Sequence, residues 1–179
     1  MDILITRHGQ TDWNVLKKVQ GKADIDLNEN GREQATIIAK KIDLEKIDLI
    51  ISSPLKRALQ TTEIINKSKG IPVIIDERIS ERDFGEFEGK RTSDFNYEEF
   101  WSYKANKGYI KAENIRDFFD RVYYFLNEVK EKYKDKRILI VTHGGVSILM
   151  KCYFSGIPDM DSVLPLCIGN CEIEKFENV

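Results

Sequence analysis

Ile138-Leu139-Ile140-Val141-Thr142-His143-Gly144-Gly145 is an apolar, mostly β-branched run that ends in a histidine and two glycines. Near the start of the chain, Ile3-Leu4-Ile5-Thr6-Arg7-His8-Gly9 has the same form. Continuous apolar runs of this length are typical of strands that are buried on both faces of a parallel sheet. Because ligands of open α/β sheets bind beyond the carboxyl ends of the strands, we expect His8 and His143 to face one crevice.

The rest of the chain alternates between strand and helix patterns, which indicates a three-layer α/β/α sandwich with a mainly parallel sheet. Apolar residues at helical spacing predict helices over 35–42, 55–65, 115–133 and 146–153. Asn114 is the expected N-cap of the third helix, Pro54 is expected in the first turn of the second, and the last should stop near 156–158. Short apolar runs predict strands over 47–51, 71–75 and 171–176. The 179 residues suit a single domain over 1–179 with one sizeable core.

Composition and charge exclude several classes of protein. The 28 Lys and Arg residues nearly balance 30 Asp and Glu, so no basic field predicts binding to nucleic acid or to an acidic membrane. The longest uncharged run, 138–150, is shorter than the ~20 residues of a spanning helix. Three cysteines without framework spacing, and no secretory leader pattern, predict a cytoplasmic protein. Cys167 and Cys171 lack the four-ligand spacing of a metal site, so we expect no metal. The sequence has neither a Walker glycine loop nor a G-x-G-x-x-G turn, so neither common nucleotide-binding motif is present.

Two further segments have residues suited to phosphate chemistry. In 52–61 a strand is followed by the start of a helix, which places Arg57 near the sheet edge and the helix N-terminus, where an anion would bind. The loop 79–89 contains four carboxylates, among them Glu81, and cleavage of a phosphate ester needs a proton for the leaving oxygen. The chain has only two histidines, and an unprotonated imidazole can attack a phosphoryl group.

In their order along the chain, these segments resemble the motifs of the histidine phosphatase superfamily, which includes the cofactor-dependent phosphoglycerate mutases and many small phosphatases. The similar stretches are Arg7-His8-Gly9-Gln10-Thr11-Asp12-Trp13-Asn14, Gln20-Gly21, Asp26-Leu27-Asn28-x-x-Gly31-x-x-Gln34-Ala35, and residues 52–61, 80–89 and 141–145. The resemblance covers most of the chain and implies a phosphoglycerate mutase-like fold. It also implies a metal-independent phosphatase, without cofactors, that hydrolyses a small phosphomonoester metabolite through a phosphohistidine.

The resemblance assigns a role to each matching residue. His8 would be the phosphorylated nucleophile, and Arg7, Arg57 and a protonated His143 would bind the phosphoryl oxygens. Glu81 would be the general acid and then the general base. The residues implied to line the pocket and to touch the phosphate or the leaving group are Asn14, Gln20 and Gly21.

Two alternatives remain open. One is a cofactor-dependent phosphoglycerate mutase, although such mutases usually carry an extra segment rich in arginine, tyrosine and proline that this chain lacks, which favours hydrolysis. The other is a non-catalytic module that binds a phospholigand on the same fold. Many phosphatases of the family have Gly-Glu-Ser where this chain has Ala112-Glu113-Asn114, so Glu113 receives no substrate role. The sequence selects neither a particular phosphomonoester nor an oligomeric state.

The segment 92–111 is rich in aromatic residues and has two interpretations. It is a cap that packs its own small core, or it is a wall that contacts the leaving group and tunes substrate choice. Its aromatic residues are Phe95, Tyr97, Phe100, Trp101, Tyr103 and Tyr109.

Overall fold

The computed structural model describes residues 1–42 and 45–179, and within them five strands form a sheet in the order β3-β2-β4-β1-β5. The strands are β1 (Asp2–Arg7), β2 (Leu49–Ser52), β3 (Val73–Ile75), β4 (Arg137–Thr142) and β5 (Ile173–Phe176). The pairs β1–β4, β4–β2 and β2–β3 are parallel, whereas β5 runs antiparallel to β1. The predicted mainly parallel sheet is therefore confirmed, with one antiparallel edge strand.

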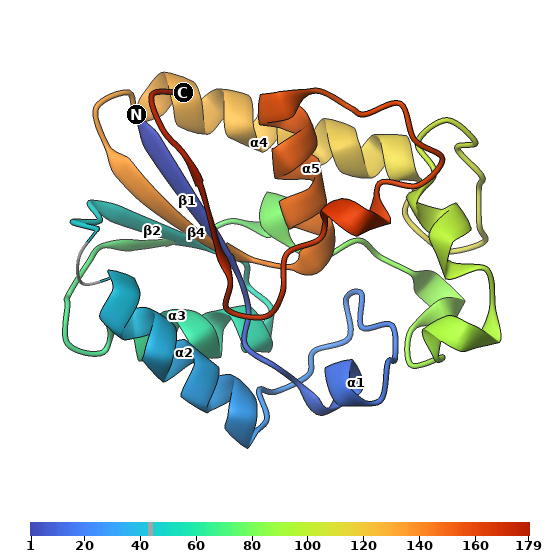
Figure 1. The fold of residues 1–179 in the computed structure, drawn as a ribbon, viewed down its shortest axis with the longest axis horizontal. Helices are drawn as coiled ribbons and strands as arrows, with labels where there is room; N and C mark the ends of the chain where they lie inside the picture. Colours follow the sequence, from blue (N-terminus) through green and yellow to red (C-terminus); the bar gives the residue numbers. More distant parts are fainter. Residues whose placement is uncertain (43–44) are drawn as a thin grey trace.

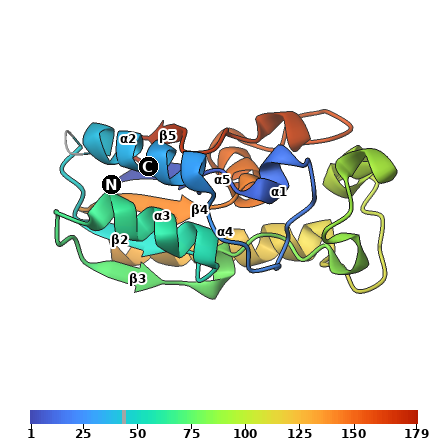
Figure 2. The same ribbon diagram turned by 90° about the horizontal axis from the view of Figure 1, so that it is seen from below.

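Helices cover both faces of this sheet (Figure 1, Figure 2). α2 (Glu29–Ile42) and α3 (Lys56–Asn66) pack on one face, and α4 (Ile115–Lys132) and α5 (Gly144–Ser155) pack on the other. Along β1, Ile3 and Ile5 enter the buried cluster shared with α4 and α5, whereas Leu4 enters the cluster shared with α2 and α3. Successive side chains of a strand point to opposite faces, so a continuous apolar run buries both sides of the sheet. The three-layer α/β/α sandwich is confirmed.

Local signals explain where the helices begin and end. The Asn114 side chain accepts a hydrogen bond from Arg116 N (2.8 Å) at the start of α4, and α5 ends at Gly156 in a left-handed conformation (φ 84°). Both ends were predicted. The position of Pro54 was predicted wrongly, because Leu55 keeps an extended backbone as the N-cap and α3 begins only after it.

The predicted strands at 47–51, 71–75 and 171–176 begin two residues later than expected, at Leu49, Val73 and Ile173. Their first apolar residues do not extend the strands. Ile47, Ile71 and Cys171 instead pack as partly buried side chains against the cluster beneath α2 and α3. Their apolar character therefore reflects side-chain packing rather than strand pairing.

The remaining elements are short and lie beyond the sheet. α1 (Asp12–Val15) follows β1, and 3₁₀ turns span Glu77–Ile79, Gly85–Phe87, Thr92–Asp94, Tyr97–Trp101 and Leu164–Leu166. In Figure 1 the yellow-green segment with residues 92–111 lies at the end of the molecule where α4 begins. Phe100 and Trp101 are buried in the same cluster as the apolar face of α4, and Phe100 stacks on Tyr109 with 3.8 Å between ring centroids. Among the described residues, no helix has the length and hydropathy to cross a bilayer.

Candidate active site

The carboxyl ends of the central strands bring the two histidines and Arg57 together. His8 follows β1, His143 follows β4 as the N-cap of α5, and Arg57 lies in the first turn of α3. The imidazole centroids of His8 and His143 are 5.2 Å apart, and Arg57 Nε donates to His8 Nε2 at 3.2 Å. These side chains therefore meet at one edge of the sheet, where ligands of such folds bind.

The tautomer of His8 is set by the backbone of the next residue. His8 Nδ1 lies 2.7 Å from the carbonyl oxygen of Gly9, which can only accept, so Nδ1 carries the hydrogen and Nε2 has the lone pair. Burial, with Arg57 and Arg7 nearby, holds the pKa of His8 well below its ordinary value of 6.5. His8 Nε2 is therefore an unprotonated nitrogen at neutral pH, as a nucleophile must be.

Two guanidinium groups beside His8 bind neutral partners rather than carboxylates. The buried Arg57 donates through its two terminal nitrogens to the carbonyls of Ala23 and Gly21, both at 2.8 Å. Burial lowers the pKa of Arg57 to about 10, which leaves it charged at neutral pH. Arg7 donates to the carbonyl of Ile168 at 3.1 Å, and its buried Nε has no partner among the described residues. Guanidinium groups whose hydrogen bonds, in the described part of the chain, go to neutral partners favour an anion.

His143 differs from its predicted protonation state. Burial, followed by the nearby charge of Arg57, holds the pKa of His143 well below 6.5. In the free protein His143 is therefore neutral at neutral pH, unlike the protonated ring that the sequence analysis expected to bind phosphate, because a third cation would be buried beside two arginines. The ring still has a nitrogen for a ligand: Nε2 lies 2.7 Å from Ser53 Oγ, and the buried Nδ1 has no partner in the described part of the chain.

Glu81 is held at the start of α5. Its Oε1 accepts from the backbone N of Arg82 at 2.9 Å, and its Oε2 accepts from Gly145 N at 3.1 Å. The free N–H groups of a helix N-terminus can hold a carboxyl oxygen in place. This arrangement fixes the Glu81 carboxyl beside the pocket that His8 and Arg57 line.

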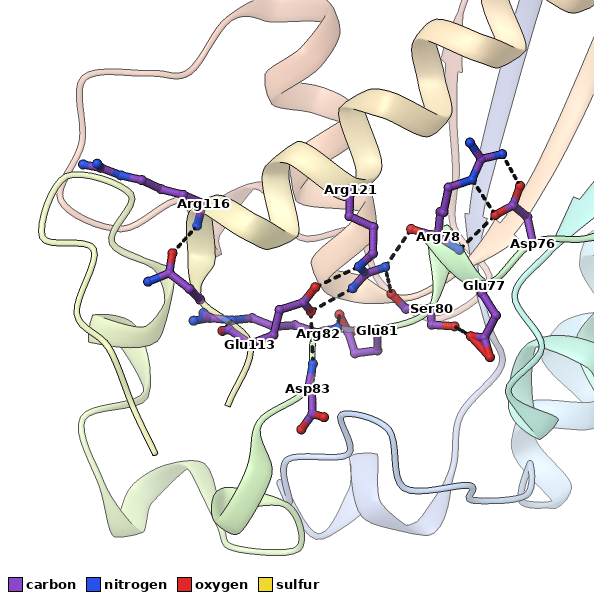
Figure 3. Close-up of polar contacts among 11 residues, drawn as sticks. Asp76, Glu77, Arg78, Ser80, Glu81, Arg82, Asp83, Glu113, Arg116 and Arg121 are labelled. Atoms are coloured by element: carbon purple, nitrogen blue, oxygen red, sulfur yellow. Dashed lines mark hydrogen bonds and ion pairs between the residues drawn. The ribbon is translucent and has the colours of Figure 1, made fainter. Parts of the chain in front are cut away.

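Two arginines fix the loop on either side of Glu81 (Figure 3). The buried Arg82 donates through Nε to the carbonyl of Glu113 at 2.9 Å and through a terminal nitrogen to the carbonyl of Phe100. Arg121 donates to both carboxylate oxygens of Glu113, each at 2.8 Å, and to the carbonyl of Ser80 at 3.0 Å. Glu113 thus forms an ion pair that supports the loop and does not line the pocket.

A cavity of about 270 Å³ lies over His8. Of the predicted site residues, the following line the cavity: Arg7, His8, Asn14, Gln20, Gly21, Arg57 and Glu81. The ring of His143 lies 5.2 Å from that of His8. Asn14 Oδ1 accepts from the backbone and the hydroxyl of Thr11 (3.0 and 3.1 Å). Gly21 has φ 52°, and a Cβ there would lie 2.0 Å from Glu88 Oε1. Its carbonyl instead holds Arg57.

The structure adds residues that the sequence reasoning did not single out. Asn170 Nδ2 donates to the carbonyl of His8 at 2.8 Å. Cys167 lines the cavity, together with Tyr97 from the aromatic segment 92–111. Ser53 follows β2 directly, so the strand-end argument that identified His8 and His143 also applies to it. Nothing in the sequence indicates that Asn170 reaches His8, because the contact joins residues from opposite ends of the chain.

Glu88 also has a role that the sequence did not indicate. Its carboxylate accepts from the backbone N of Lys22 (2.7 Å), Ala23 (2.9 Å) and Phe84 (3.3 Å). It thereby links the loop after α1 to the loop that contains Glu81. Glu88 therefore joins two loops of the site through backbone hydrogen bonds.

Comparison with known proteins places this geometry in a family. The model of the histidine phosphatase superfamily (branch 1) matches residues 3–178. The uncharacterized phosphatase PhoE of Bacillus subtilis is 35% identical over 176 residues, covering 97% of this chain and 89% of the relative. Phosphoserine phosphatase 1 of Hydrogenobacter thermophilus is 32% identical over 164 residues, covering 87% and 76%. The solved structure of Bacillus stearothermophilus YhfR has a TM-score of 0.88 at 28% identity and covers 98% of this chain and 90% of that one.

Proposed function

Because this chain belongs to the histidine phosphatase superfamily and is a phosphatase, we propose that it hydrolyses small phosphomonoester metabolites without a metal ion, through a phosphohistidine on His8. The observation that carries the proposal is the setting of His8 Nε2. This unprotonated nitrogen receives a hydrogen bond from Arg57, whose buried guanidinium has only neutral hydrogen-bond partners among the residues that the structure describes. The three free cysteines support a reducing compartment, which we take to be the cytoplasm.

In the proposed first step, His8 Nε2 attacks phosphorus and the bond from phosphorus to the ester oxygen breaks. Arg57 Nε, which occupies the lone pair of His8 Nε2 in the free protein, turns to a phosphoryl oxygen when substrate binds. Arg7 and Arg57 neutralise the charge on the phosphoryl oxygens, which is the main task in phosphoryl transfer. The carboxyl of Glu81 gives its proton to the leaving oxygen.

In the proposed second step, the Glu81 carboxylate takes a proton from a water molecule that attacks the phosphohistidine. The bond between phosphorus and His8 Nε2 breaks, inorganic phosphate leaves, and His8 regains its lone pair. The hydrogen bond from His8 Nδ1 to the Gly9 carbonyl keeps the ring oriented throughout. One residue therefore serves as acid and then as base, and every proton and phosphoryl oxygen is accounted for.

The mouth of the cavity favours leaving groups that carry a second negative charge. Lys17 and Lys18 line it, and within residues 1–42 and 45–179 neither ammonium is paired with a carboxylate. Lys17 has a left-handed backbone (φ 52°) that lysine rarely adopts, and its carbonyl is fixed by a hydrogen bond from Thr92 N (2.9 Å). Lys18 Nζ lies 5.6 Å from the ring centroid of Trp13. We therefore expect esters with an anionic leaving group to bind more tightly.

The function is tested by product analysis with 3-phosphoglycerate and a panel of phosphorylated metabolites, with and without a chelator. The proposal expects release of inorganic phosphate at a rate that the chelator leaves unchanged. Formation of 2-phosphoglycerate without phosphate release would instead show a mutase. Tight binding of inorganic phosphate with no turnover of any ester would show a non-catalytic binding module.

A further inference from the structure

Ser53 and His143 form a buried pair next to His8, whose ring centroid lies 5.2 Å from that of His143. Ser53 follows β2 and His143 follows β4, and these strands pair in parallel with Ser52 opposite Val141. The backbone N of Ser53 donates to the carbonyl of Val141 at 3.0 Å, which continues the ladder by one residue. Both side chains are fully buried, and Ser53 Oγ lies 2.7 Å from His143 Nε2.

The hydrogen of the Ser53 hydroxyl has one available acceptor. In the described part of the chain, the other hydrogen bond of Ser53 Oγ is one that it accepts from Leu55 N at 3.3 Å. If His143 Nε2 carried a hydrogen, the Ser53 hydroxyl hydrogen and the lone pair of His143 Nδ1 would both be buried without partners. If the hydroxyl donates to Nε2, only the Nδ1–H group is left. The second arrangement is favoured because an unmet buried donor or acceptor is destabilising.

We propose that Ser53 holds His143 in the neutral Nδ1–H tautomer, so that this ring donates a hydrogen bond to a phosphoryl oxygen without carrying a charge. Ser53 is thus a positioning residue, acting through His143 on the reaction proposed above, on which the inference rests. The buried Nδ1 of His143, which has no partner among the described residues, is the atom that the phosphoryl group would satisfy. The opposite tautomer would present a lone pair to an anion and repel it.

A neutral donor also suits the charges around the pair. The positive charges of Arg57, Arg7 and Lys22 act on His143, and the ring of His8 lies 5.2 Å away. A protonated His143 would add a third buried positive charge and would compete with Glu81 as a proton source for the leaving oxygen. A neutral His143 leaves charge neutralisation to the arginines and proton transfer to Glu81.

The direct test is the tautomer of each imidazole, read from long-range ¹H–¹⁵N spectra of protein labelled with ¹⁵N-histidine at pH 7.5. Ring nitrogens with a hydrogen and those with a lone pair have different ¹⁵N shifts. The chain has only two histidines, so a His8→Ala variant assigns both sets of signals. The proposal expects hydrogen on Nδ1 and a lone pair on Nε2 of His143. A lone pair on Nδ1, or hydrogen on both nitrogens, would overturn it.

Substitutions at two adjacent serines distinguish the positioning role of Ser53 from the general effect of removing a buried hydroxyl. Ser53→Ala should move hydrogen to His143 Nε2 and raise the inhibition constant of inorganic phosphate by about tenfold, as expected for loss of a hydrogen bond to a charged acceptor. Ser53→Thr keeps a hydroxyl group, so it should restore both the His143 tautomer and the inhibition constant of inorganic phosphate. Ser52→Ala removes a hydroxyl that bonds Thr62 and the Ser53 carbonyl, and should change neither readout. Equal effects of Ser52→Ala and Ser53→Ala would contradict the proposal.

The spectra of the unaltered protein need no turnover, so the two proposals can fail separately. A chain that hydrolyses phosphomonoesters but holds His143 as the Nε2–H tautomer overturns the role of Ser53 and leaves the function intact. A chain with the Nδ1–H tautomer and no hydrolysis overturns the function and keeps the hydrogen-bond assignment.

Discussion

A Cβ at Gly145 would lie 2.2 Å from Oε1 of Glu81, and the backbone N of Gly145 donates to Oε2 of the same carboxylate at 3.1 Å. The first turn of α5 therefore binds the carboxylate through an N–H group, and the absence of a side chain at Gly145 leaves room for that carboxylate. The same Cβ would lie 2.7 Å from the ring of Trp101, so no free space remains on that side. Glycine at this position is what allows Glu81 to reach the start of the helix.

The substitution Gly145→Ala should displace the Glu81 carboxyl and lower kcat by about a hundredfold, the effect of misplacing a reacting group by roughly 1 Å. Steady-state kinetics with a phosphomonoester checks this prediction. Gly108→Ala is the matched control, because nothing lies within 4 Å of a Cβ at that position. Unchanged kcat in Gly145→Ala would show that the position of Glu81 does not limit the reaction.

The proposed acid role of Glu81 predicts a dependence on the leaving group. Glu81→Gln should lower kcat/KM for alkyl phosphates by about 10²- to 10⁴-fold, because an alkoxide needs a proton as it leaves. The loss should be much smaller with p-nitrophenyl phosphate, whose phenolate leaves without protonation. Glu86→Gln, an exposed carboxylate on the same loop, should change neither. Equal losses on the two substrates would argue against general-acid catalysis by Glu81.

The lysines at the cavity mouth predict a charge preference in the substrate. Lys17→Met and Lys18→Met should raise KM for 3-phosphoglycerate several-fold, since each removes a partly exposed charge contact of at most about 1 kcal/mol. KM for glycerol 3-phosphate, which lacks the carboxylate, should change much less. Lys41→Met, an exposed lysine on α2, controls for net charge. A similar rise in KM on both esters would mean that the lysines do not sense the leaving group.

The sequence predicted the parts of the site that follow from local patterns. It did not predict the contacts between residues that lie far apart along the chain. The apolar runs before His8 and His143 predicted their positions, because strand ends follow from local patterns and a parallel sheet aligns those ends. The identity of the supporting groups could not be predicted in that way. Glu113 binds Arg121, and Asn170 holds the carbonyl of His8, through contacts that only the folded chain creates.

The neutral state of His143 in the free protein was not predicted, for a related reason. The expected positive charge followed from the need of a phosphate for donors, which takes no account of burial. The structure places His143 in the interior, beside Arg57 and next to the Ser53 hydroxyl. The environment of an ionisable group is set by every element packed around it, and sequence spacing does not report that environment.

The two neutral histidines predict a loss of stability in weak acid. Both have folded pKa values well below 6.5, so below pH 6.5 the unfolded chain binds protons that the folded chain does not. The free energy of unfolding should therefore fall as pH drops from 6.5 to 5, by up to about 1.4 kcal/mol per pH unit for each histidine. The pKa of Asp76 lies below its ordinary value of 3.8, because Arg78 binds its carboxylate, so Asp76 titrates below this window.

Urea unfolding at intervals between pH 5 and 7.5 measures this slope. For the double variant His8→Asn, His143→Asn, the free energy of unfolding should be nearly independent of pH between 5 and 6.5, whatever its absolute value. A slope that survives the double substitution would assign the proton uptake to other groups.

The covalent step at His8 is tested most directly by trapping the phosphorylated protein. The protein is mixed with a phosphomonoester, quenched in alkali within one turnover, digested, and its peptides are mapped by mass spectrometry. We expect phosphate on His8, stable in alkali and lost in acid, and no phosphorylated peptide from His8→Ala. Phosphate on another residue, or full hydrolytic activity in His8→Ala, would contradict a phosphohistidine mechanism at this site.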